Sequence, residues 1–381
     1  MQAKNGFVVS ARARVMGCAI AVLALAAMTF ASAAGAVTPS ETTTYLALGD
    51  SISFGYTQEK FDLNFPNEAP SYFENGFDNF FAKDLDKGNE AGAGVTIVND
   101  ACPGETSNGL IGENEALGGQ KSTEPAGHDP QGLGDYHPCA YLNVDGLPLH
   151  NSLSVGGQSI SQLEDALSIL KEGKPAHPVD AITLNIGSND ELAAITQCED
   201  EVKEELEKEG KSKYKGGSPE LDVSLCIGYM AEHVTIPHIL HNIGQILGVL
   251  DSKEPGGGHY TGPIVLLGFY NPLTFIIPTT DTLQHATNEA VEKDILPLFA
   301  NVTFANPFPV FNKGGAGVNP TKEKEAICKY TEMCNPFDQA ANEAKAGHAL
   351  PEDDGDIHPS LTGYKELAKL VNEAYLHNPA H

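Results

Sequence analysis

The chain has few basic residues for its size. Its 381 residues include 23 lysines and arginines against 51 aspartates and glutamates, which gives a formal net charge of -28 at pH 7. A surface of this sign repels polyanions, so nucleic acids and anionic membrane surfaces are poor candidate partners. The hydrophobic content of 41% is nevertheless enough for a sizeable core, which excludes a disordered chain.

Motifs of several enzyme classes are also absent. The sequence has no Gly-x-Ser-x-Gly elbow, which argues against the common α/β-hydrolase fold, and it has neither a His-Glu-x-x-His zinc motif nor a phosphate-binding loop. No two cysteines show the Cys-x-x-Cys spacing that zinc favours, and the acidic run at 352–356 lacks the spacing of a known calcium loop. We therefore expect no metal and no cofactor.

Only one long apolar run is present, and it lies near the N-terminus. Val15 to Phe30 follows three basic residues and precedes the small residues of 31–36, a layout that is typical of a secretory signal peptide. A membrane anchor is the alternative, but a spanning helix needs about 20 apolar residues. We predict that residues 1–36 are a signal peptide, that residues 37–381 form a single domain, and that the protein is secreted as a monomer without a stable membrane anchor.

The cysteines indicate the same compartment. Six of the seven lie beyond the predicted signal peptide, and an even number of cysteines in an exported chain indicates disulfides. Many pairings are compatible with the sequence, and pairing of neighbours along the chain is the simplest. The expected bridges join Cys102 to Cys139, Cys198 to Cys226, and Cys328 to Cys334.

Short apolar runs alternate along the chain with segments of helical spacing. The runs are typical of buried strands, and the segments place apolar residues on one helix face. This alternation predicts an α/β fold, a five-stranded parallel sheet between two layers of helices. The expected strands lie at 45–48, 95–98, 181–186, 264–267 and 302–304, and the expected helices at 72–85, 160–170, 236–250, 282–296 and 364–374.

Two stretches interrupt the alternation. Residues 104–157 are rich in Gly, Pro, Asn and Asp, and because loops of this length are usually functional or flexible, we predict a wall on the substrate side. Residues 199–222 are highly charged, with Glu to Lys pairs at helical spacing. We predict that they form a surface excursion, which the bridge between Cys198 and Cys226 closes at its base.

Four motifs contain residues that are candidates for a catalytic site. Gly-Asp-Ser follows the first predicted strand, Pro-Gly follows the second, Gly-Ser-Asn-Asp follows the third, and His-Pro precedes the last helix. Because sites in parallel sheets lie beyond the carboxyl ends of the strands, the first three motifs stand where a site is expected. The candidate residues are Ser51, Gly104, Asn189 and His358.

These residue types fit nucleophilic catalysis. A serine hydroxyl is a weak nucleophile at neutral pH, and it becomes effective when an imidazole within hydrogen-bond reach takes its proton. Ser51 and His358 are candidates for such a pair, with His358 later returning the proton to a leaving alcohol. The alternatives are structural, since Ser51 could cap a helix and Asn189 could belong to a turn.

Together and in this order, the four motifs resemble those of the GDSL or SGNH hydrolases, over most of the chain from Tyr45 to Ala374. The segment from Cys328 to Cys334 further resembles the secreted actinobacterial esterases and lipases of this family. The resemblance implies a flavodoxin-like three-layer fold and hydrolysis of carboxylic esters through a covalent acyl-enzyme.

The resemblance also implies roles for individual residues. Ser51 would be the nucleophile and His358 the general base. The oxyanion hole would consist of the backbone N–H groups of Ser51 and Gly104 and the side-chain amide of Asn189. Such donors stabilise the charge of a tetrahedral intermediate by about 2.7 to 4 kcal/mol each.

One position departs from the family pattern. The family usually has an aspartate three residues before the catalytic histidine, and position 355 is a glycine here. Asp356 or Asp354 could orient the imidazole instead, and we favour Asp356. A Ser-His dyad that uses a backbone carbonyl is the remaining alternative.

The resulting hypothesis is a secreted serine esterase or lipase that acts on lipid or short acyl esters. A deacetylase of acetylated polysaccharides would use the same site. A non-catalytic binding module on a hydrolase scaffold is a third alternative, which the presence of all four candidate residues argues against. Neither the acyl chain length nor the alcohol of the substrate follows from the sequence.

Overall fold

The computed structural model describes residues 42–381 with some gaps. The gaps are 65–66, 68, 89–93, 113–147, 156–157, 172–177, 278, 316 and 336–355. All described residues belong to one compact unit, Pro39–His381. The predicted signal peptide, Cys139 and Asp354 lie outside the described residues, so the predictions that concern them stay predictions.

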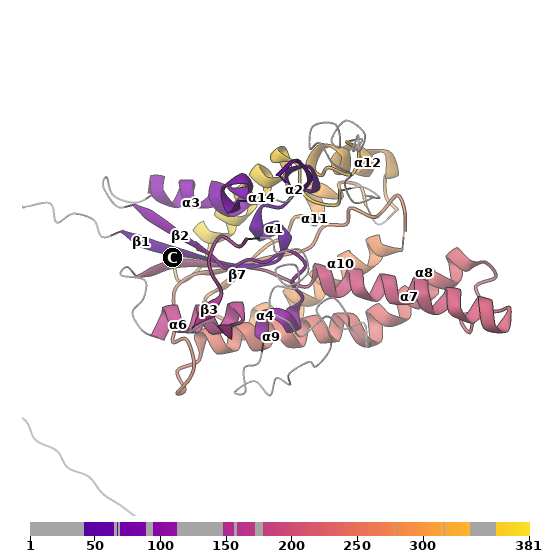
Figure 1. Ribbon diagram of the computed structural model, residues 1–381, viewed down its shortest axis with the longest axis horizontal. Coiled ribbons are helices and arrows are strands. Elements are labelled where there is room, and N and C mark those ends of the chain that lie inside the picture. Colours follow the sequence, from indigo (N-terminus) through magenta and orange to yellow (C-terminus); the bar gives the residue numbers. More distant parts are fainter. Residues whose placement is uncertain are drawn as a thin grey trace, which may run out of the picture. The chain divides into compact units, whose positions relative to one another are not determined.

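A five-stranded parallel sheet forms the middle layer of the fold (Figure 1). The strands are β1 (Thr43–Gly49), β2 (Val95–Asn99), β5 (Val179–Asn185), β6 (Ile264–Leu267) and β7 (Val302–Ala305). Their order across the sheet is β2-β1-β5-β6-β7, and every neighbouring pair is parallel. The predicted five-stranded parallel sheet is therefore confirmed.

Helices cover both faces of this sheet, as Figure 1 shows. On one face lie α6 (Gln162–Lys171) and α9 (Ile236–Asp251), and on the other lie α3 (Phe77–Gly88) and α14 (Leu361–Leu376). Successive side chains of a strand point to opposite faces, so β1 contributes alternate residues to each of the two cores. The prediction of a three-layer α/β/α fold is confirmed.

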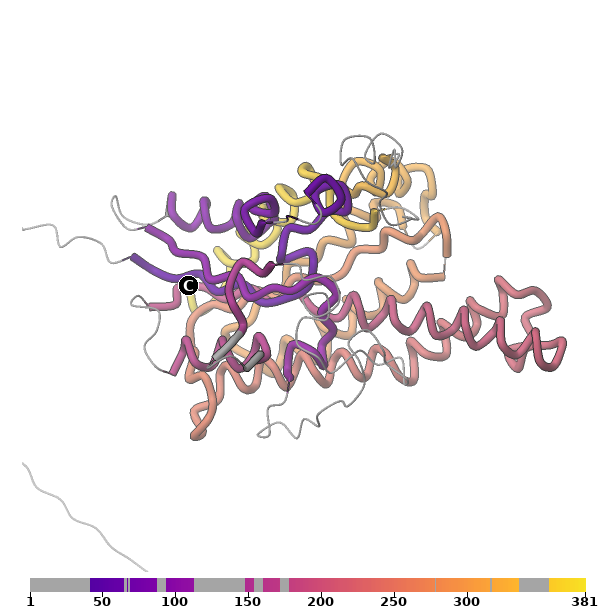
Figure 2. The backbone as a smooth tube through the Cα atoms, in the orientation of Figure 1, coloured from indigo at the N-terminus to yellow at the C-terminus, as the bar shows by residue number. Residues whose placement is uncertain are grey.

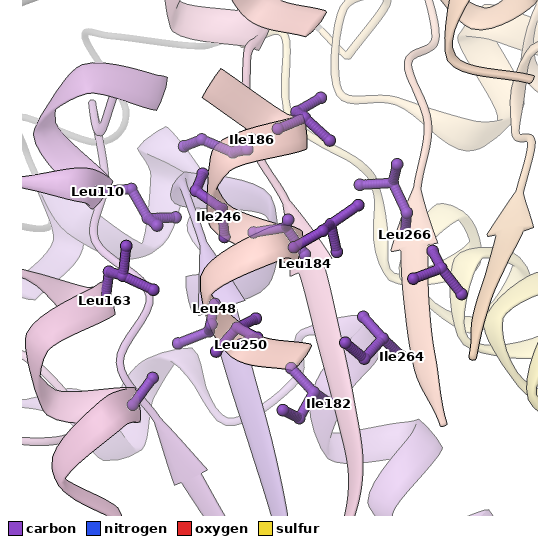
Figure 3. Close-up of a cluster of buried hydrophobic side chains, with 14 of the residues drawn as sticks. Leu48, Leu110, Leu163, Ile182, Leu184, Ile186, Ile246, Leu250, Ile264 and Leu266 are labelled. Atoms are coloured by element: carbon purple, nitrogen blue, oxygen red, sulfur yellow. The ribbon is translucent and has the colours of Figure 1, made fainter. Parts of the chain in front are cut away.

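The core beneath α6 and α9 consists of branched aliphatic side chains (Figure 3). Ile246 and Leu250, one turn apart on α9, lie over Leu48 of β1 and Leu184 of β5, and Leu163 of α6 packs beside them. Burial of each such side chain contributes about 1.5 to 3 kcal/mol. This packing holds the strands together and thereby fixes where their carboxyl ends lie.

The prediction of one helix at 72–85 is wrong for its first residues. A short 3-10 helix, η1 (Pro70–Phe73), comes first, and α3 begins only at Phe77. Gly76 separates the two, and a Cβ atom on Gly76 would lie 2.9 Å from the Cα atom of Gly55. The close approach of these two backbone segments interrupts the helix, which sequence periodicity does not reveal.

Two helices change pitch shortly before a proline. The π-helix η3 (Ala231–Thr235) precedes Pro237 of α9, and the π-helix η4 (Val291–Ile295) precedes Pro297. A proline has no N–H group and its ring collides with the carbonyl four residues earlier, so the helix widens there. The segment expected at 282–296 is therefore not one uniform α-helix.

The remaining helices are short or lie around the carboxyl ends of the strands. They are α1 (Ser51–Phe54), α2 (Gln58–Asn64), α4 (Ser107–Ile111), α10 (Thr280–Ala290), η5 (Leu296–Leu298), α11 (Phe308–Phe311) and α12 (Pro320–Tyr330). In the part of the chain that the structure describes, no helix combines the length and apolarity needed to cross a membrane.

The stretch 104–157 is not an irregular loop at its ends. It contains α4 near its start and β3 (Ser154–Val155) near its end, and β3 pairs antiparallel with β4 (Gln158–Ser159), which lies just beyond the stretch. Thr106 caps α4 through a hydrogen bond from the backbone N–H of Gly109, 3.2 Å long. A cap and a tight hairpin need few apolar residues, which is why the sequence pattern missed both elements.

The charged stretch 199–222 is the outer part of a helical hairpin. Helices α7 (Ser188–Glu209) and α8 (Pro219–Met230) lie side by side and extend away from the carboxyl ends of the strands (Figures 1 and 2). A disulfide joins Cys198 to Cys226 across the hairpin. The expected excursion is thus a continuation of the helix that begins at the strand end.

A second disulfide joins Cys328, in the last turn of α12, to Cys334, which lies beyond the end of the helix. Both bridges follow the nearest-neighbour pairing expected from the sequence. The bridge between Cys102 and Cys139 stays a prediction, because Cys139 lies outside the described residues.

Replacing both Cys198 and Cys226 by alanine should lower the free energy of unfolding by about 3.5 kcal/mol. The bridge closes a long loop, with a sequence separation of 28, and so restricts the unfolded chain. Urea unfolding followed by circular dichroism measures the loss. The bridge between Cys328 and Cys334 has a separation of only 6, so the same replacement there should cost about 2.4 kcal/mol. An equal or larger loss for the shorter loop would contradict this account.

Candidate active site

Ser51 is the first residue of α1, immediately beyond the carboxyl end of β1. The carboxylate of Asp50 caps this helix by accepting a hydrogen bond of 2.9 Å from the N–H of Ile52. Gly49 has a φ angle of 153°, and a Cβ atom there would lie 2.3 Å from the carbonyl oxygen of Asn185 on β5. Only glycine allows β1 to approach β5 so closely at the turn that presents Ser51.

His358 lies between β7 and α14, and its ring is held by Asp356. The Nδ1 atom of His358 lies 2.6 Å from Oδ1 of Asp356, and the backbone N–H of His358 donates to the same oxygen over 3.0 Å. The other oxygen of Asp356 accepts a hydrogen bond of 2.9 Å from the N–H of Gln58. The geometry therefore supports Asp356, two residues before the histidine, as the carboxylate that orients the imidazole.

Two aromatic residues restrict the same segment further. The ring of Tyr56 packs against the ring of His358 with 4.8 Å between centroids. The hydroxyl of Tyr270 donates a hydrogen bond of 2.9 Å to the carbonyl of Ile357. His358 is therefore positioned both through its ring and through its backbone, although no regular element contains it.

The environment of Asp356 keeps this carboxyl ionised. Burial opposes ionisation, but the charge of His358 and the hydrogen bonds from His358 and Gln58 outweigh it and lower the pKa of Asp356 below 3.8. A carboxyl whose pKa falls on folding stabilises the fold at higher pH. This contribution is present above about pH 4 and is lost as the pH falls through the folded pKa.

Asp50 behaves differently from Asp356. Burial raises the pKa of Asp50 to about 7, although the hydrogen bond from Ile52 and the charge of His358 act in the opposite direction. One of its oxygens caps α1. Asp50 thus holds the turn at Ser51.

Gly104 lies in the loop after β2, and Asn189 lies in the first turn of α7, which follows β5. These two strands are the neighbours of β1. Gly104 has a φ angle of 79° in a turn that the hydrogen bond from Glu105 N–H to the Cys102 carbonyl closes, 3.2 Å long. The side-chain nitrogen of Asn189 donates to the carbonyl of Glu105 over 2.8 Å. One N–H of the Asn189 amide is thereby fixed beside the Gly104 turn.

Asp190 connects the first turn of α7 to the first residue of α4. Its carboxylate accepts hydrogen bonds from the backbone N–H of Ser107, at 2.9 Å, and from the Ser107 hydroxyl, at 2.6 Å. The amide of Asn242 on α9 donates to that hydroxyl over 2.8 Å. Asp190 stands in the motif that named Asn189, but its partner Ser107 is 83 positions away, so the sequence did not reveal this contact.

Ser51, Asn189 and His358 line one pocket. Gly104 is not among the residues that line it, and it is linked to the pocket through Glu105, which binds Asn189. Three of the four candidate residues therefore face a common space, although they come from three distant parts of the sequence.

The pocket also has an apolar wall. Leu192 and Ile195 of α7 form one part of it, and Ile52 and Leu273 form others. Leu192 and Ile195 lie one turn apart, just beyond Asn189 on the same helix. The helix that carries the Asn189 amide thus also supplies the apolar surface.

A buried acid closes the polar part of the pocket. Glu191 accepts a hydrogen bond of 2.8 Å from the hydroxyl of Thr287 and another from the amide of Gln284. Burial raises the pKa of Glu191 to about 8, although these two hydrogen bonds lower it.

The chain belongs to the GDSL-like lipase/acylhydrolase family, whose model matches residues 45–371. A comparison with curated proteins finds no match. Among solved structures, the chain is similar to a lipase from a goat rumen metagenome, with 17% identity and a TM-score of 0.40, over 87% of this chain and 97% of the lipase. It is also similar to a carbohydrate esterase family 2 enzyme with a carbohydrate-binding domain from Corynascus thermopiles (Myceliophthora fergusii), with 15% identity and a TM-score of 0.39, over 89% of this chain and 67% of that one.

Replacing Asp356 by asparagine should lower kcat for ester hydrolysis on the order of 10²- to 10⁴-fold. An amide at this position no longer favours the Nδ1–H tautomer of His358, and it does not stabilise the imidazolium. Initial rates on a p-nitrophenyl ester measure the effect. The matched variant Asp354→Asn should retain the wild-type rate, and a larger loss for Asp354→Asn than for Asp356→Asn would assign the role to Asp354 instead.

Proposed function

We propose that this protein is a serine esterase or lipase that hydrolyses carboxylic esters through an acyl-enzyme on Ser51. The observation that carries the proposal is the meeting of Ser51, Asn189 and His358 in one pocket, with Asp356 bound to His358. This arrangement combines a nucleophile, an oriented base and a hydrogen-bond donor. Membership of the lipase/acylhydrolase family supports the same reaction class.

In the first half of the reaction, the Ser51 oxygen attacks the ester carbonyl carbon while Nε2 of His358 takes the hydroxyl proton. The carbonyl oxygen becomes an oxyanion, which accepts hydrogen bonds from the backbone N–H groups of Ser51 and Gly104 and from the amide of Asn189. The tetrahedral intermediate then breaks its bond to the alcohol oxygen, and His358 protonates the leaving alcohol.

In the second half, His358 removes a proton from a water molecule, whose oxygen attacks the acyl carbonyl carbon. The bond from the acyl carbon to the Ser51 oxygen then breaks, His358 returns the proton to that oxygen, and the acid leaves. Asp356 keeps Nδ1 of His358 protonated throughout, so that Nε2 is the nitrogen that exchanges the proton. Each oxyanion donor contributes about 2.7 to 4 kcal/mol to transition-state stabilisation.

The apolar wall supports esters with a hydrocarbon acyl group. Leu192, Ile195 and Leu273 offer an acyl chain contacts that a sugar hydroxyl does not use. We therefore propose lipid or short acyl esters as substrates and place the acyl group against α7. Deacetylation of polysaccharides is the second candidate, because the same catalytic residues serve it.

We also propose that the protein acts outside the cell. Disulfides persist in oxidising compartments, and the chain has two of them among its described residues. The predicted signal peptide at residues 1–36 supports export. N-terminal sequencing of the protein from culture medium tests both points.

Replacing Ser51 by alanine should reduce hydrolysis of p-nitrophenyl butyrate on the order of 10⁶-fold, to the background rate, because no other group then forms the acyl-enzyme. Circular dichroism should be unchanged, since Ser51 is only half-buried. A fluorophosphonate should label the wild type and spare the variant. Wild-type activity in the Ser51→Ala variant would refute the proposed mechanism, and absence of both hydrolysis and labelling in the wild type would favour a binding module.

Replacing Ile195 by phenylalanine should lower kcat/KM for p-nitrophenyl octanoate at least tenfold more than for p-nitrophenyl acetate. The larger ring fills the apolar part of the pocket, which only the long acyl chain reaches. Thr196→Phe is the matched control, because Thr196 is exposed on the same helix and does not line the pocket. Equal losses on both esters would contradict the placement of the acyl chain, and faster turnover of acetylated xylan than of either ester would favour the deacetylase.

A further inference from the structure

Gln162, the first residue of α6, contacts the backbone of the turn that presents Ser51. Its Oε1 atom accepts a hydrogen bond from the N–H of Gly49, and its Nε2 atom donates to the carbonyl of the same residue, each 2.8 Å long. Because a backbone N–H only donates and a carbonyl only accepts, this pair of bonds fixes which way the Gln162 amide points. The side chain is fully buried, so water does not compete for these bonds.

The same amide reaches the second loop of the site. Nε2 of Gln162 lies 3.2 Å from Oε2 of Glu105, which is 1% exposed and directly follows Gly104. The carbonyl of Glu105 in turn accepts the hydrogen bond from Asn189. The carbonyl of Gly49 also accepts a bond of 3.0 Å from the N–H of Cys102, at the start of the Gly104 turn.

A continuous set of hydrogen bonds therefore joins the three parts of the oxyanion hole. It runs from Gly49, two residues before Ser51, through Gln162 to Glu105 and then to Asn189. We propose that Gln162 is a positioning residue for ester hydrolysis, which fixes the Ser51 turn relative to the Gly104 and Asn189 donors. This inference rests on the proposed function.

Such positioning matters because oxyanion donors act only within a narrow range of geometry. They stabilise the transition state when they lie about 2.7 to 3.1 Å from the position that the oxyanion takes, and a displacement near 1 Å can cost about 100-fold in rate. α6 is a suitable anchor, because the next residue, Leu163, is packed in the core between β1 and α9 (Figure 3). The hydrogen bonds of Gln162 to Gly49 and Glu105 thus link the turn at Ser51 and the Gly104 loop to the packed core.

The first test replaces Gln162 by methionine, which has a similar length and makes neither the bond to Gly49 nor that to Glu105. We expect kcat for p-nitrophenyl butyrate to fall about 100-fold while KM changes less than about threefold, because the lost interaction acts on the transition state. Inhibition by an alkylboronic acid, which forms a tetrahedral adduct on the serine, should weaken by about the same factor as kcat/KM.

Leu167→Ala is the control for a purely structural effect. It removes core packing from α6 more than one turn beyond Gln162, and Leu167 does not line the pocket. It should lower the unfolding temperature at least as much as Gln162→Met and leave kcat within about threefold of the wild type. Equal losses of kcat in the two variants would overturn the proposal.

A second pair of variants keeps the test decisive if Gln162→Met does not fold. Gln162→Glu keeps the acceptor for the N–H of Gly49 but places carboxylate oxygens against the Gly49 carbonyl and against Glu105, so it should lower kcat about 100-fold. Adding Glu105→Gln removes only the second of these repulsions, because a carboxylate at position 162 does not donate to the Gly49 carbonyl. The double variant should therefore stay at least about tenfold below the wild type, and wild-type kcat in it would overturn the proposal.

The outcome separates this inference from the proposed function. If the wild type hydrolyses the ester and Ser51→Ala does not, the proposed function stands whatever the Gln162 variants do. If Gln162→Met then keeps kcat and boronate affinity within about threefold of the wild type, only the positioning role of Gln162 is refuted.

Discussion

The site depends on β1 lying between β2 and β5 in a parallel sheet. Parallel strands bring their carboxyl ends to the same edge, so the segments that carry Ser51, Gly104 and Asn189 leave the sheet side by side. The approach of β1 to β5 is so close at Gly49 that no side chain fits there. The proposed nucleophile and the proposed oxyanion donors therefore owe their proximity to strand order and to the absence of one Cβ atom.

His358 is positioned in a different way, by contacts from several elements. Asp356 fixes its Nδ1 atom, Tyr56 packs on its ring, and Tyr270 holds the preceding carbonyl. A base on an irregular segment needs such contacts, because no helix or strand fixes its backbone. The low pKa of Asp356 follows from this arrangement, since the charge and hydrogen bonds of His358 outweigh the effect of burial.

Helix α7 connects the Asn189 amide with the apolar wall of the pocket. Its first turn carries Asn189 and Asp190, its next residues supply the apolar wall through Ile195, and the bridge at Cys198 ties it to α8. One rigid element therefore sets the distance between the donor and the wall. The charged outer part of the hairpin is a continuation of this element.

The sequence by itself determined the five strands and the two layers of helices, because apolar periodicity is a local feature, and its short motifs singled out Ser51, Asn189 and His358 as candidates. Features without apolar periodicity were missed, among them the short helix α4 and the interruption between η1 and α3. The carboxylate partner of His358 stayed open between two neighbours until the hydrogen bond to Asp356 was seen. Gln162 has no local signal at all, since Gly49 and Glu105 lie 113 and 57 positions away, and only the tertiary structure brings them together.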